Sequence, residues 1–275
     1  MLLFDSHVHS HHSHDSRQTM EEIFAAARER GLAGIAITDH ADIWYLEQDH
    51  TFEHIGASVM EAELAEGLFE GEVRFFAGIE VSDHADGPGG VRKLLELAEY
   101  DVVLGSVHCV RFEDWDDAYS RLCFDASVPE EKIHAFLKVY FDKLLTMAQT
   151  QDYDVLTHLT CPLRYINGKY QRGISVEPHG DVIETILQTV IEREKSLEIN
   201  TSGIGAAYIG IMPDEAILRR YYEMGGRMIT LGSDGHMPEK IGNGFEEAIA
   251  LLKQIGFTGY HYYEKRKPVF VSFDA

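Results

Sequence analysis

The chain has 275 residues, and its 24 Lys and Arg against 46 Asp and Glu give a formal net charge of −22 at pH 7. This excess of negative charge repels a phosphate backbone, so the composition argues against a nucleic-acid partner. The three cysteines, Cys109, Cys123 and Cys161, have no Cys-x-x-Cys spacing, which excludes a thiolate zinc knuckle and favours a reducing compartment.

Apolar runs typical of strands alternate with helical segments along the chain. A capping box at Thr19-Met20-Glu21-Glu22 predicts a helix that stops at Gly31, and a strand at 33–38 follows. The later pairs are helix 52–68 with strand 73–79, helix 89–98 with strand 101–106, helix 130–149 with strand 154–157, helix 179–194 with strand 197–200, and helix 213–224 with strand 227–232; helix 239–254 and the run 268–272 complete the set.

This alternation predicts an α/β fold with a parallel sheet, and seven or eight repeats favour a closed barrel. We find no linker or internal repeat, so we expect one domain over residues 1–275. The chain shows no signal peptide before Asp5 and no apolar run of transmembrane length, so we expect a cytoplasmic protein without a membrane partner. The oligomeric state stays open.

Histidine and acidic residues recur where the apolar runs end. In a β/α barrel the C-terminal ends of the strands converge on one mouth, so residues far apart in sequence share one pocket. Imidazole and carboxylate groups are the ligands that suit Zn, Mn and Fe ions. The sequence therefore predicts a metal site built from Asp5, His7, His9, Asp39, His40, Glu80, His108, His158, Asp234 and His236.

Three longer segments, 41–51, 109–128 and 161–178, follow strands, which is where substrate loops belong in a barrel. Aromatic residues in the first two segments are candidates for the wall of the pocket, although aromatic loop residues more often pack the loop down. They are Trp44, Tyr45 and Trp115.

The strand-end motifs, taken in order, resemble the polymerase and histidinol phosphatase (PHP) family. They are Asp5-Ser6-His7-Val8-His9, Thr38-Asp39-His40, Gly78-Ile79-Glu80, Gly105-Ser106-Val107-His108, Thr157-His158 and Gly232-Ser233-Asp234-Gly235-His236. Two further elements, 13–16 and 197–203, resemble the free-standing histidinol-phosphatase branch in particular. The resemblance implies a distorted, TIM-barrel-like (β/α)7 barrel that carries a trinuclear metal cluster.

The resemblance also implies which residues would hold two to three divalent transition metal ions (Zn, Mn or Fe). His7, His9, Glu80 and Asp234 would hold one ion, Glu80 would bridge to a second bound by His108 and His158, and His40 and His236 would hold the third. The last ligand of the third ion is expected to be Asp15. His14 is the alternative, because some relatives use histidine in this stretch, and His11 and His12 are also close by.

We therefore predict a phosphomonoesterase that hydrolyses L-histidinol phosphate, a step of histidine biosynthesis, by in-line attack of a hydroxide that bridges the metals. The chain has neither a GxSxG elbow nor a GxxxxGK[ST] loop, which removes the usual covalent and nucleotide-dependent alternatives. Glu80, Asp234 and Arg164 are the expected catalytic residues. The only expected partner is a small phosphorylated metabolite.

Three residues are candidates for substrate binding. Arg164 follows a ligand strand by six residues and has the bidentate geometry that suits a phosphate. Arg17 is the next candidate, and its alternative role is an ion pair with nearby acids. Asn200, at a strand end, is expected either to orient the substrate or a ligand, or to cap a loop.

Two other functions remain open at this point. One is a PHP phosphoesterase that acts on a different small phosphate ester. The other is a non-catalytic metal-binding module, like the PHP domains that are appended to polymerases.

Overall fold

The computed structural model describes residues 1–205 and 210–274. Its strands are β1 (Phe4–Val8), β2 (Gly34–Ile37), β3 (His40–Asp42), β4 (Arg74–Ser82), β5 (Val102–Ser106), β6 (Cys109–Phe112), β7 (Trp115–Ala118), β8 (Val155–Leu156), β9 (Ser196–Asn200), β10 (Ile229–Gly232), β11 (Gly259–Glu264) and β12 (Lys267–Ser272). Its α-helices are α1 (Met20–Glu29), α2 (Thr51–Leu68), α3 (Pro88–Leu95), α4 (Glu130–Thr150), α5 (Gly180–Glu192), α6 (Glu215–Glu223) and α7 (Phe245–Ile255).

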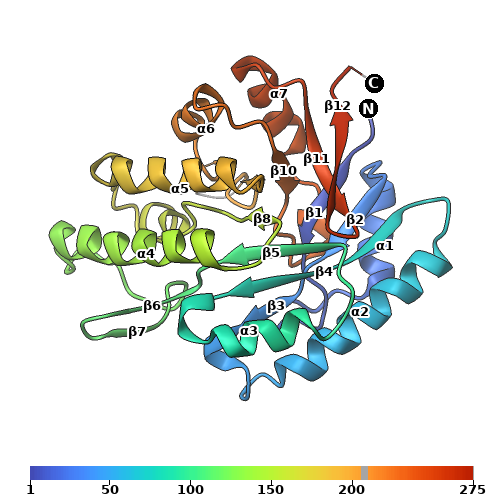
Figure 1. Ribbon diagram of the computed structural model, residues 1–275, viewed down its shortest axis with the longest axis horizontal. Helices are drawn as coiled ribbons and strands as arrows, with labels where there is room; N and C mark the ends of the chain where they lie inside the picture. The colour runs from blue at the N-terminus through green and yellow to red at the C-terminus, as the bar shows by residue number, and fades with distance from the viewer. Residues whose placement is uncertain (206–209, 275) are drawn as a thin grey trace.

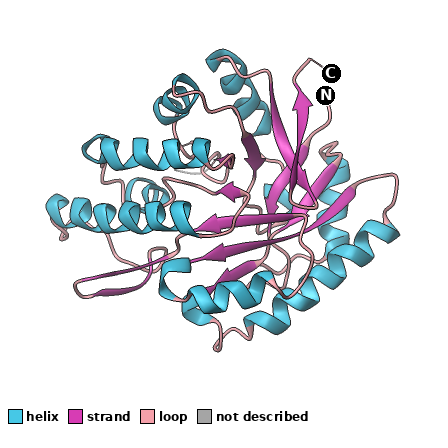
Figure 2. Cartoon of the chain, viewed as in Figure 1, coloured by secondary structure: helices cyan, strands magenta, loops and turns pink. Residues whose placement is uncertain are grey.

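Seven parallel strands form the central sheet, in the order β1, β2, β4, β5, β8, β9 and β10. Strand β3 also pairs with β4 and continues the line of β2 after a break at Thr38 and Asp39. The two ends of the sheet meet where Val8 bridges Gly235 and the His9 amide donates to the Gly235 carbonyl at 3.1 Å. The sheet is thus nearly closed into a barrel with helices around it, as the sequence predicted (Figures 1 and 2).

Local sequence signals explain several element boundaries. The Thr19 hydroxyl accepts a hydrogen bond from the Glu22 amide at 3.3 Å, and the Glu22 carboxylate accepts one from the Thr19 amide at 2.9 Å. This is the predicted capping box, and it starts α1 at Met20. The chain leaves the helix through Gly31, whose φ of +68° lies in the left-handed region that glycine adopts at little cost.

The barrel strands are buried on both faces, which is why they read as continuous apolar runs. All residues of β2 and β5 are buried, because helices cover the outside of the barrel and side chains fill its interior. Gly78 and Gly105 lie where a Cβ atom would press on neighbouring side chains, Val102 in one case and Met147 in the other. The core therefore depends on small residues at these crossing points.

The C-terminal run 268–272 was expected to complete the barrel repeats, and this expectation was wrong. The run belongs to β12, which pairs antiparallel with β11 in a separate two-stranded sheet. This hairpin lies against the N-terminal ends of the barrel strands, opposite the predicted metal site. There the Tyr260 hydroxyl accepts from the Phe4 amide at 2.8 Å, and the Tyr263 and Ser196 hydroxyls are 2.9 Å apart.

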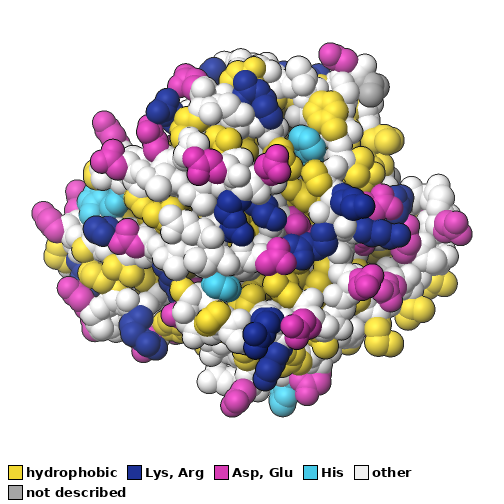
Figure 3. Space-filling view, viewed as in Figure 1, with side chains coloured by type: hydrophobic (Ala, Val, Ile, Leu, Met, Phe, Trp, Pro, Cys, Tyr) yellow, Lys and Arg dark blue, Asp and Glu magenta, His cyan; other side chains and the backbone are white. Residues whose placement is uncertain are grey.

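The three longer segments carry more regular structure than expected. Segment 41–51 contains most of β3 and a 3-10 helix at Ile43–Tyr45, segment 109–128 contains the hairpin of β6 and β7, and segment 161–178 contains a π-helix at Arg164–Lys169. Among the described residues, no helix has both the length and the apolar character that crossing a membrane requires. On the face seen in Figure 3, acidic and basic side chains are interspersed.

Candidate metal centre

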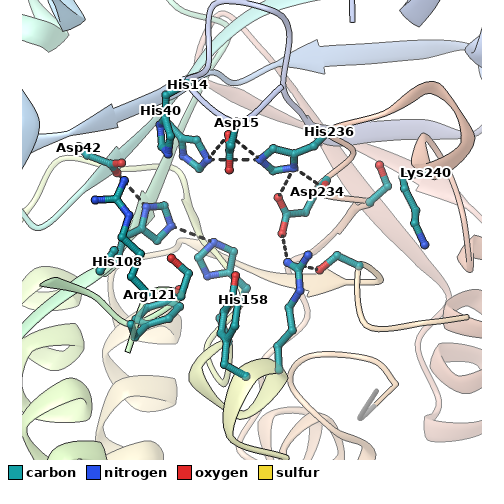
Figure 4. Close-up of a pocket in the computed structure, with 18 of the residues that line it drawn as sticks. His14, Asp15, His40, Asp42, His108, Arg121, His158, Asp234, His236 and Lys240 are labelled. Atoms are coloured by element: carbon teal, nitrogen blue, oxygen red, sulfur yellow. Dashed lines mark hydrogen bonds and ion pairs between the residues drawn. The ribbon is translucent and has the colours of Figure 1, made fainter. Parts of the chain in front are cut away.

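The nine predicted metal ligands meet at the mouth formed by the C-terminal ends of the barrel strands. His7 lies in β1, His40 begins β3 and Glu80 lies near the end of β4. The others are in the segments that directly follow a barrel strand: His9 and Asp15 after β1, His108 after β5, His158 after β8, and Asp234 and His236 after β10. Figure 4 shows most of them converging on one cavity.

The ligand atoms form overlapping groups within metal-binding reach. In each group the nitrogen or oxygen atoms lie within 4.8 Å of one another. Glu80 belongs to two groups, and its carboxylate is 2.8 Å from His158 Nε2, 3.2 Å from His108 Nε2 and 2.9 Å from His40 Nδ1. The groups are His7 with His9 and Asp234, His7 with Glu80 and His158, His40 with Glu80 and His108, and His9 with His40 and His236.

Asp15, rather than His14, lies between the imidazoles of the third predicted position. Its Oδ1 atom is 3.2 Å from His236 Nε2 and 3.5 Å from His40 Nε2. The His14 ring lines the same cavity, with its centre 5.4 Å from that of His40. Figure 4 shows the Asp15 carboxylate between the two rings.

Imidazole nitrogens face one another in pairs inside this site. His7 Nε2 is 3.0 Å from His9 Nε2, and His40 Nε2 is 3.4 Å from His236 Nε2. The outer nitrogen of His7 contacts the Glu198 carboxylate at 2.6 Å. When the outer N–H is donated to an acceptor in this way, the inner nitrogen of the neutral imidazole presents a lone pair, and two such facing nitrogens need either a shared proton or a metal ion between them.

Two other outer nitrogens have similar partners, whereas His158 Nδ1 has no hydrogen-bond partner among the described residues. His108 Nδ1 is 2.8 Å from the Asp42 carboxylate, and His9 Nδ1 is 3.1 Å from the Ser13 hydroxyl. That hydroxyl itself donates to Asp39 at 2.6 Å, so it accepts from His9. These contacts fix the ring orientations in the way that metal-binding histidines are usually fixed.

Two buried polar atoms at the centre of the site lack a hydrogen-bond partner among the described residues. They are Glu80 Oε2 and His40 Nδ1, which lie 2.9 Å apart without hydrogen-bond geometry. Buried polar atoms without partners are rare, because each costs about 1–3 kcal/mol. The donor set of imidazole and carboxylate, together with these atoms, fits divalent metal ions.

Charge coupling between the ligands shifts their pKa values strongly. Burial lowers the pKa of His7, but the charges of Glu198 and Glu80 outweigh burial and hold this pKa well above its usual value. Burial raises the pKa of Glu80, but the neighbouring His108 and His7 hold it well below its usual value. Without metal, these groups form ion pairs, so metal binding has to displace protons.

Comparison with known proteins identifies the family. A family model described as the PHP domain matches residues 5–202. The chain belongs to the PHP family.

Relatives of this PHP protein align along nearly its whole length. A probable histidinol-phosphatase of Clostridium acetobutylicum is 28% identical over 270 residues, which cover 96% of this chain and 98% of the relative. A histidinol-phosphatase of Lactococcus lactis subsp. lactis is 25% identical over 259 residues, which cover 94% and 93%.

A solved structure confirms the expected fold. It is the histidinol phosphate phosphatase from Lactococcus lactis subsp. lactis, complexed with zinc, L-histidinol and phosphate. Its TM-score with the PHP protein is 0.76 at 21% sequence identity, and the match covers 97% of this chain and 98% of that one.

Glu198 is a site residue that the strand-end pattern missed. It is buried in β9, contacts His7, and also accepts from the His158 amide at 2.7 Å. The available signal was a charged residue in the middle of the apolar strand 197–200. Gly232 in β10 faces it, and a Cβ atom at Gly232 would collide with the Glu198 carboxylate. The glycine of the last PHP motif therefore makes room for this contact.

Asp5 and Asp39 were predicted as part of the metal site, but neither belongs to a ligand group among the described residues. Asp5 lies near the start of β1 and Asp39 follows β2, and their side chains support the backbone of the site. Asp5 accepts from the Ser233 hydroxyl at 2.5 Å and the Gly242 amide at 2.9 Å, and burial raises its pKa to about 6. Asp39 accepts from the Ser10 amide at 2.7 Å and from three hydroxyl groups. They connect β1 and β2 to the loops that carry the ligands.

The three substrate-binding candidates lie in different environments. Arg164 lines the cavity, and its guanidinium donates to Asp234 at 3.2 Å and to the Ser202 hydroxyl at 3.1 Å. Asn200 is buried behind the wall, where its amide donates to Glu198 at 3.1 Å and accepts from Ser202. Arg17 is exposed and is not among the residues that line the cavity.

The cavity has a volume of about 320 Å³. Two basic residues that the sequence did not single out, Arg121 and Lys240, line it together with Arg164. Tyr45 also lines the cavity, as was considered for the loop aromatics. Trp115, by contrast, packs against Phe124 and Phe136 with ring centres 5.2 and 5.5 Å away. The wall of the pocket thus carries both aromatic rings and positive charge.

Proposed function

We propose that this PHP protein is a metal-dependent phosphomonoesterase that hydrolyses L-histidinol phosphate to L-histidinol and phosphate. We further propose that it works with two to three divalent transition metal ions (Zn, Mn or Fe). The observation that carries the proposal is the convergence of facing imidazole nitrogens around the unsatisfied Glu80 carboxylate. Relatives that are named histidinol-phosphatases, and that align over nearly the whole chain, support the substrate.

The ligand groups suggest how the ions would be held. His7, His9, Glu80 and Asp234 would hold one ion, Glu80 with His108 and His158 a second, and His40, His236 and Asp15 the third. When bound, such ions clamp phosphate oxygens, lower the pKa of water and stabilise a leaving oxygen.

Arg164 is the best-positioned side chain for gripping the phosphate. Burial lowers the pKa of its guanidinium, but the Asp234 carboxylate holds this pKa above its usual value, so the group stays charged. One of its terminal nitrogens already bonds Asp234 and Ser202, which fixes the guanidinium at the cavity edge. A fixed guanidinium matches the oxygens of a phosphate in a bidentate way. Arg121 and Lys240 add positive charge to the same cavity.

The size and charge of the cavity favour a small phosphorylated metabolite. A volume of about 320 Å³ lies at the lower end of the range for small-molecule sites. The acidic side chains of Asp15 and Asp42 line it beside the histidines, and three basic residues line it as well. A substrate with an anionic phosphate and a cationic remainder, such as histidinol phosphate, is complementary to this mixture.

The test is phosphate release by protein purified without chelator and supplied with Mn²⁺ or Zn²⁺. We expect the kcat/KM for L-histidinol phosphate to exceed that for 4-nitrophenyl phosphate and for a panel of other phosphomonoesters by at least tenfold. Much faster hydrolysis of another ester would overturn the substrate and favour a PHP phosphoesterase of different specificity. No hydrolysis of any ester by metal-replete protein would favour a non-catalytic metal-binding module.

A further inference from the structure

A second group of metal-binding side chains lies outside the nine residues of the metal centre. It consists of His11 and His12, in the loop after β1, and Glu61 on helix α2. We propose that these three residues bind one divalent transition metal ion at a site separate from the catalytic cluster. The proposal does not depend on which phosphate ester the protein hydrolyses.

The three side chains are already close to coordination geometry. His12 Nε2 is 3.3 Å and His11 Nε2 is 3.8 Å from the same Glu61 oxygen, and the three ligand atoms all lie within 4.8 Å of one another. Ligand bonds of about 2.0–2.2 Å at tetrahedral angles place ligand atoms about 3.3–3.6 Å apart. Small side-chain rotations are therefore enough to surround an ion.

The more buried imidazole of this group, that of His12, has an unsatisfied ring nitrogen among the described residues. The side chain of His12 is only 10% exposed, and its Nε2 atom is buried without a hydrogen-bond partner among the described residues. The atom lies 3.3 Å from a Glu61 carboxylate oxygen but does not meet hydrogen-bond geometry with it. An unsatisfied buried nitrogen next to a carboxylate and a second imidazole is the arrangement that a cation completes.

Backbone contacts hold the loop in this conformation. The His11 amide donates to the Gln18 carbonyl at 2.9 Å, and the His12 amide donates to the Ser10 hydroxyl at 3.2 Å. Ser10 is in turn fixed by Asp39 through its amide and its hydroxyl. Adjacent histidines normally point apart, yet these two rings lie with their centres 4.2 Å apart. The loop thus presents both imidazoles to α2.

The surroundings of the group suit a borderline ion such as Zn²⁺ or Co²⁺. Two imidazoles and one carboxylate are a ligand set for such ions, with water in the open position. His11 and Glu61 are 38% and 41% exposed, so water can reach the site and ions can exchange. His54, about two turns before Glu61 on α2, has its ring centre 6.3 Å from that of His12.

Both imidazoles of the group border a hollow of about 200 Å³. His40 of the catalytic cluster lines the same hollow. Within the described residues, no group of ligand atoms in mutual reach combines His11, His12 or Glu61 with a residue of the catalytic cluster. An ion bound there would thus be additional to the cluster.

The experiment measures bound Zn²⁺ by equilibrium dialysis and elemental analysis as free Zn²⁺ is raised over the metal-loaded protein. The wild type should take up one equivalent beyond the plateau of the catalytic cluster. Glu61→Gln should weaken this last equivalent roughly tenfold or more, because metal affinity falls by 10–100-fold even when only an outer contact is lost. His12→Gln should do the same, and the cluster plateau should be unchanged in both variants.

Glu63→Gln is the matched control, because Glu63 is exposed on the same helix and its substitution removes the same charge. It should bind the additional equivalent like the wild type. Equal uptake by the wild type and Glu61→Gln would overturn the proposal. So would equal weakening in the Glu61 and Glu63 variants, because that would reveal a general effect of surface charge.

Discussion

At the scale of single residues, two of the candidate ligands have an unusual backbone conformation. Asp234 has φ +51° and His158 has φ +26°, values that residues with a Cβ atom seldom adopt. Such conformations cost about 1–3 kcal/mol each and persist only where the surroundings enforce them. For His158 the surroundings include Glu198, which accepts a hydrogen bond from its amide. The ligands are therefore oriented by the fold itself.

The third metal position gives a first prediction. Asp15→Ala should lower the bound metal by up to one equivalent per chain, because the Asp15 carboxylate lies between His40 and His236. His14→Ala should retain the wild-type metal content, because the His14 ring lies outside this pair. Elemental analysis of both variants, purified in parallel without chelator, is the measurement. The reverse pattern would make His14 the ligand.

Arg164 gives a second prediction. Arg164→Ala should lower kcat/KM for the phosphate ester by roughly 10–100-fold, which corresponds to about 1.5–3 kcal/mol for a hydrogen bond to a charged group. The metal content should stay normal, because Arg164 is not a metal ligand and bonds Asp234 Oδ2, whereas Asp234 Oδ1 faces His9. Arg17→Ala is the control, since Arg17 is exposed away from the cavity. Equal losses in both variants would contradict the role assigned to Arg164.

The residues that could be predicted from the sequence are those whose position follows from the strand ends. All nine expected ligands are at one mouth because parallel strands bring their C-terminal ends together. The orientation of Arg17 could not be predicted, because it is set by its neighbours in the folded loop. Ser16 and Gln18 are buried and bond the His9 carbonyl, which turns Arg17 outward. Glu198 supports His7 and His158 through contacts between different segments, which the spacing of residues in the sequence does not reveal.

At the scale of elements, the alternation of helices and strands was predictable, but the C-terminal hairpin was not. The turn between β11 and β12 is formed by Lys265 and Arg266, which both have positive φ. Two-residue turns of this kind usually carry Asn-Gly or Asp-Gly, so this hairpin lacks its sequence signal. The turn is held instead by distant contacts, because both amides bond Asp101.

The anchoring of this hairpin gives a third prediction. Tyr260→Phe should lower the free energy of unfolding by about 1–3 kcal/mol, because the buried Phe4 amide then loses its acceptor. Chemical denaturation monitored by circular dichroism measures the change. In the neighbouring Tyr262, the hydroxyl makes no hydrogen bond to described residues, and its ring stacks on Phe4 with centres 3.9 Å apart. Tyr262→Phe should therefore be nearly neutral, and an equal cost in both variants would argue against the anchor.

At the scale of the whole molecule, the protein carries a net charge of −22, and some of its carboxylates lie beside the histidines of the metal centre. Burial lowers the pKa values of His40 and His108, but the nearby Glu80 charge holds both pKa values well above the usual value. Asp15 adds to this effect at His40, and Asp42 adds to it at His108. His7 behaves in the same way. The metal-free protein thus binds protons at these positions more tightly than the unfolded chain does. That residues 1–275 form one domain stays a prediction.

This coupling gives a fourth prediction, for the metal-free protein. A histidine whose pKa is raised by folding stabilises the folded protein. This contribution is fully present at pH values below the histidine pKa in the unfolded chain, about 6.5, and it is lost as the pH rises through the pKa in the folded protein. The melting temperature in the presence of EDTA should therefore fall between pH 6.5 and 9. A loss of about 1 kcal/mol shifts the melting temperature of a protein of this size by roughly 2–4 °C. Metal-loaded protein should decline less, because its histidine ligands are already neutral. A flat or rising metal-free curve would contradict the assignment.

The closure of the barrel between β1 and β10 has a consequence for biosynthesis. His7 and His9 lie far upstream of Asp234 and His236 in the sequence, so they leave the ribosome well before those two residues. The seam at Val8 and Gly235 can form only after both of these segments have been made. Until then, a nascent chain carries an open sheet that lacks the last two candidate ligands. The complete ligand set therefore becomes available to metal ions only after His236 has been made.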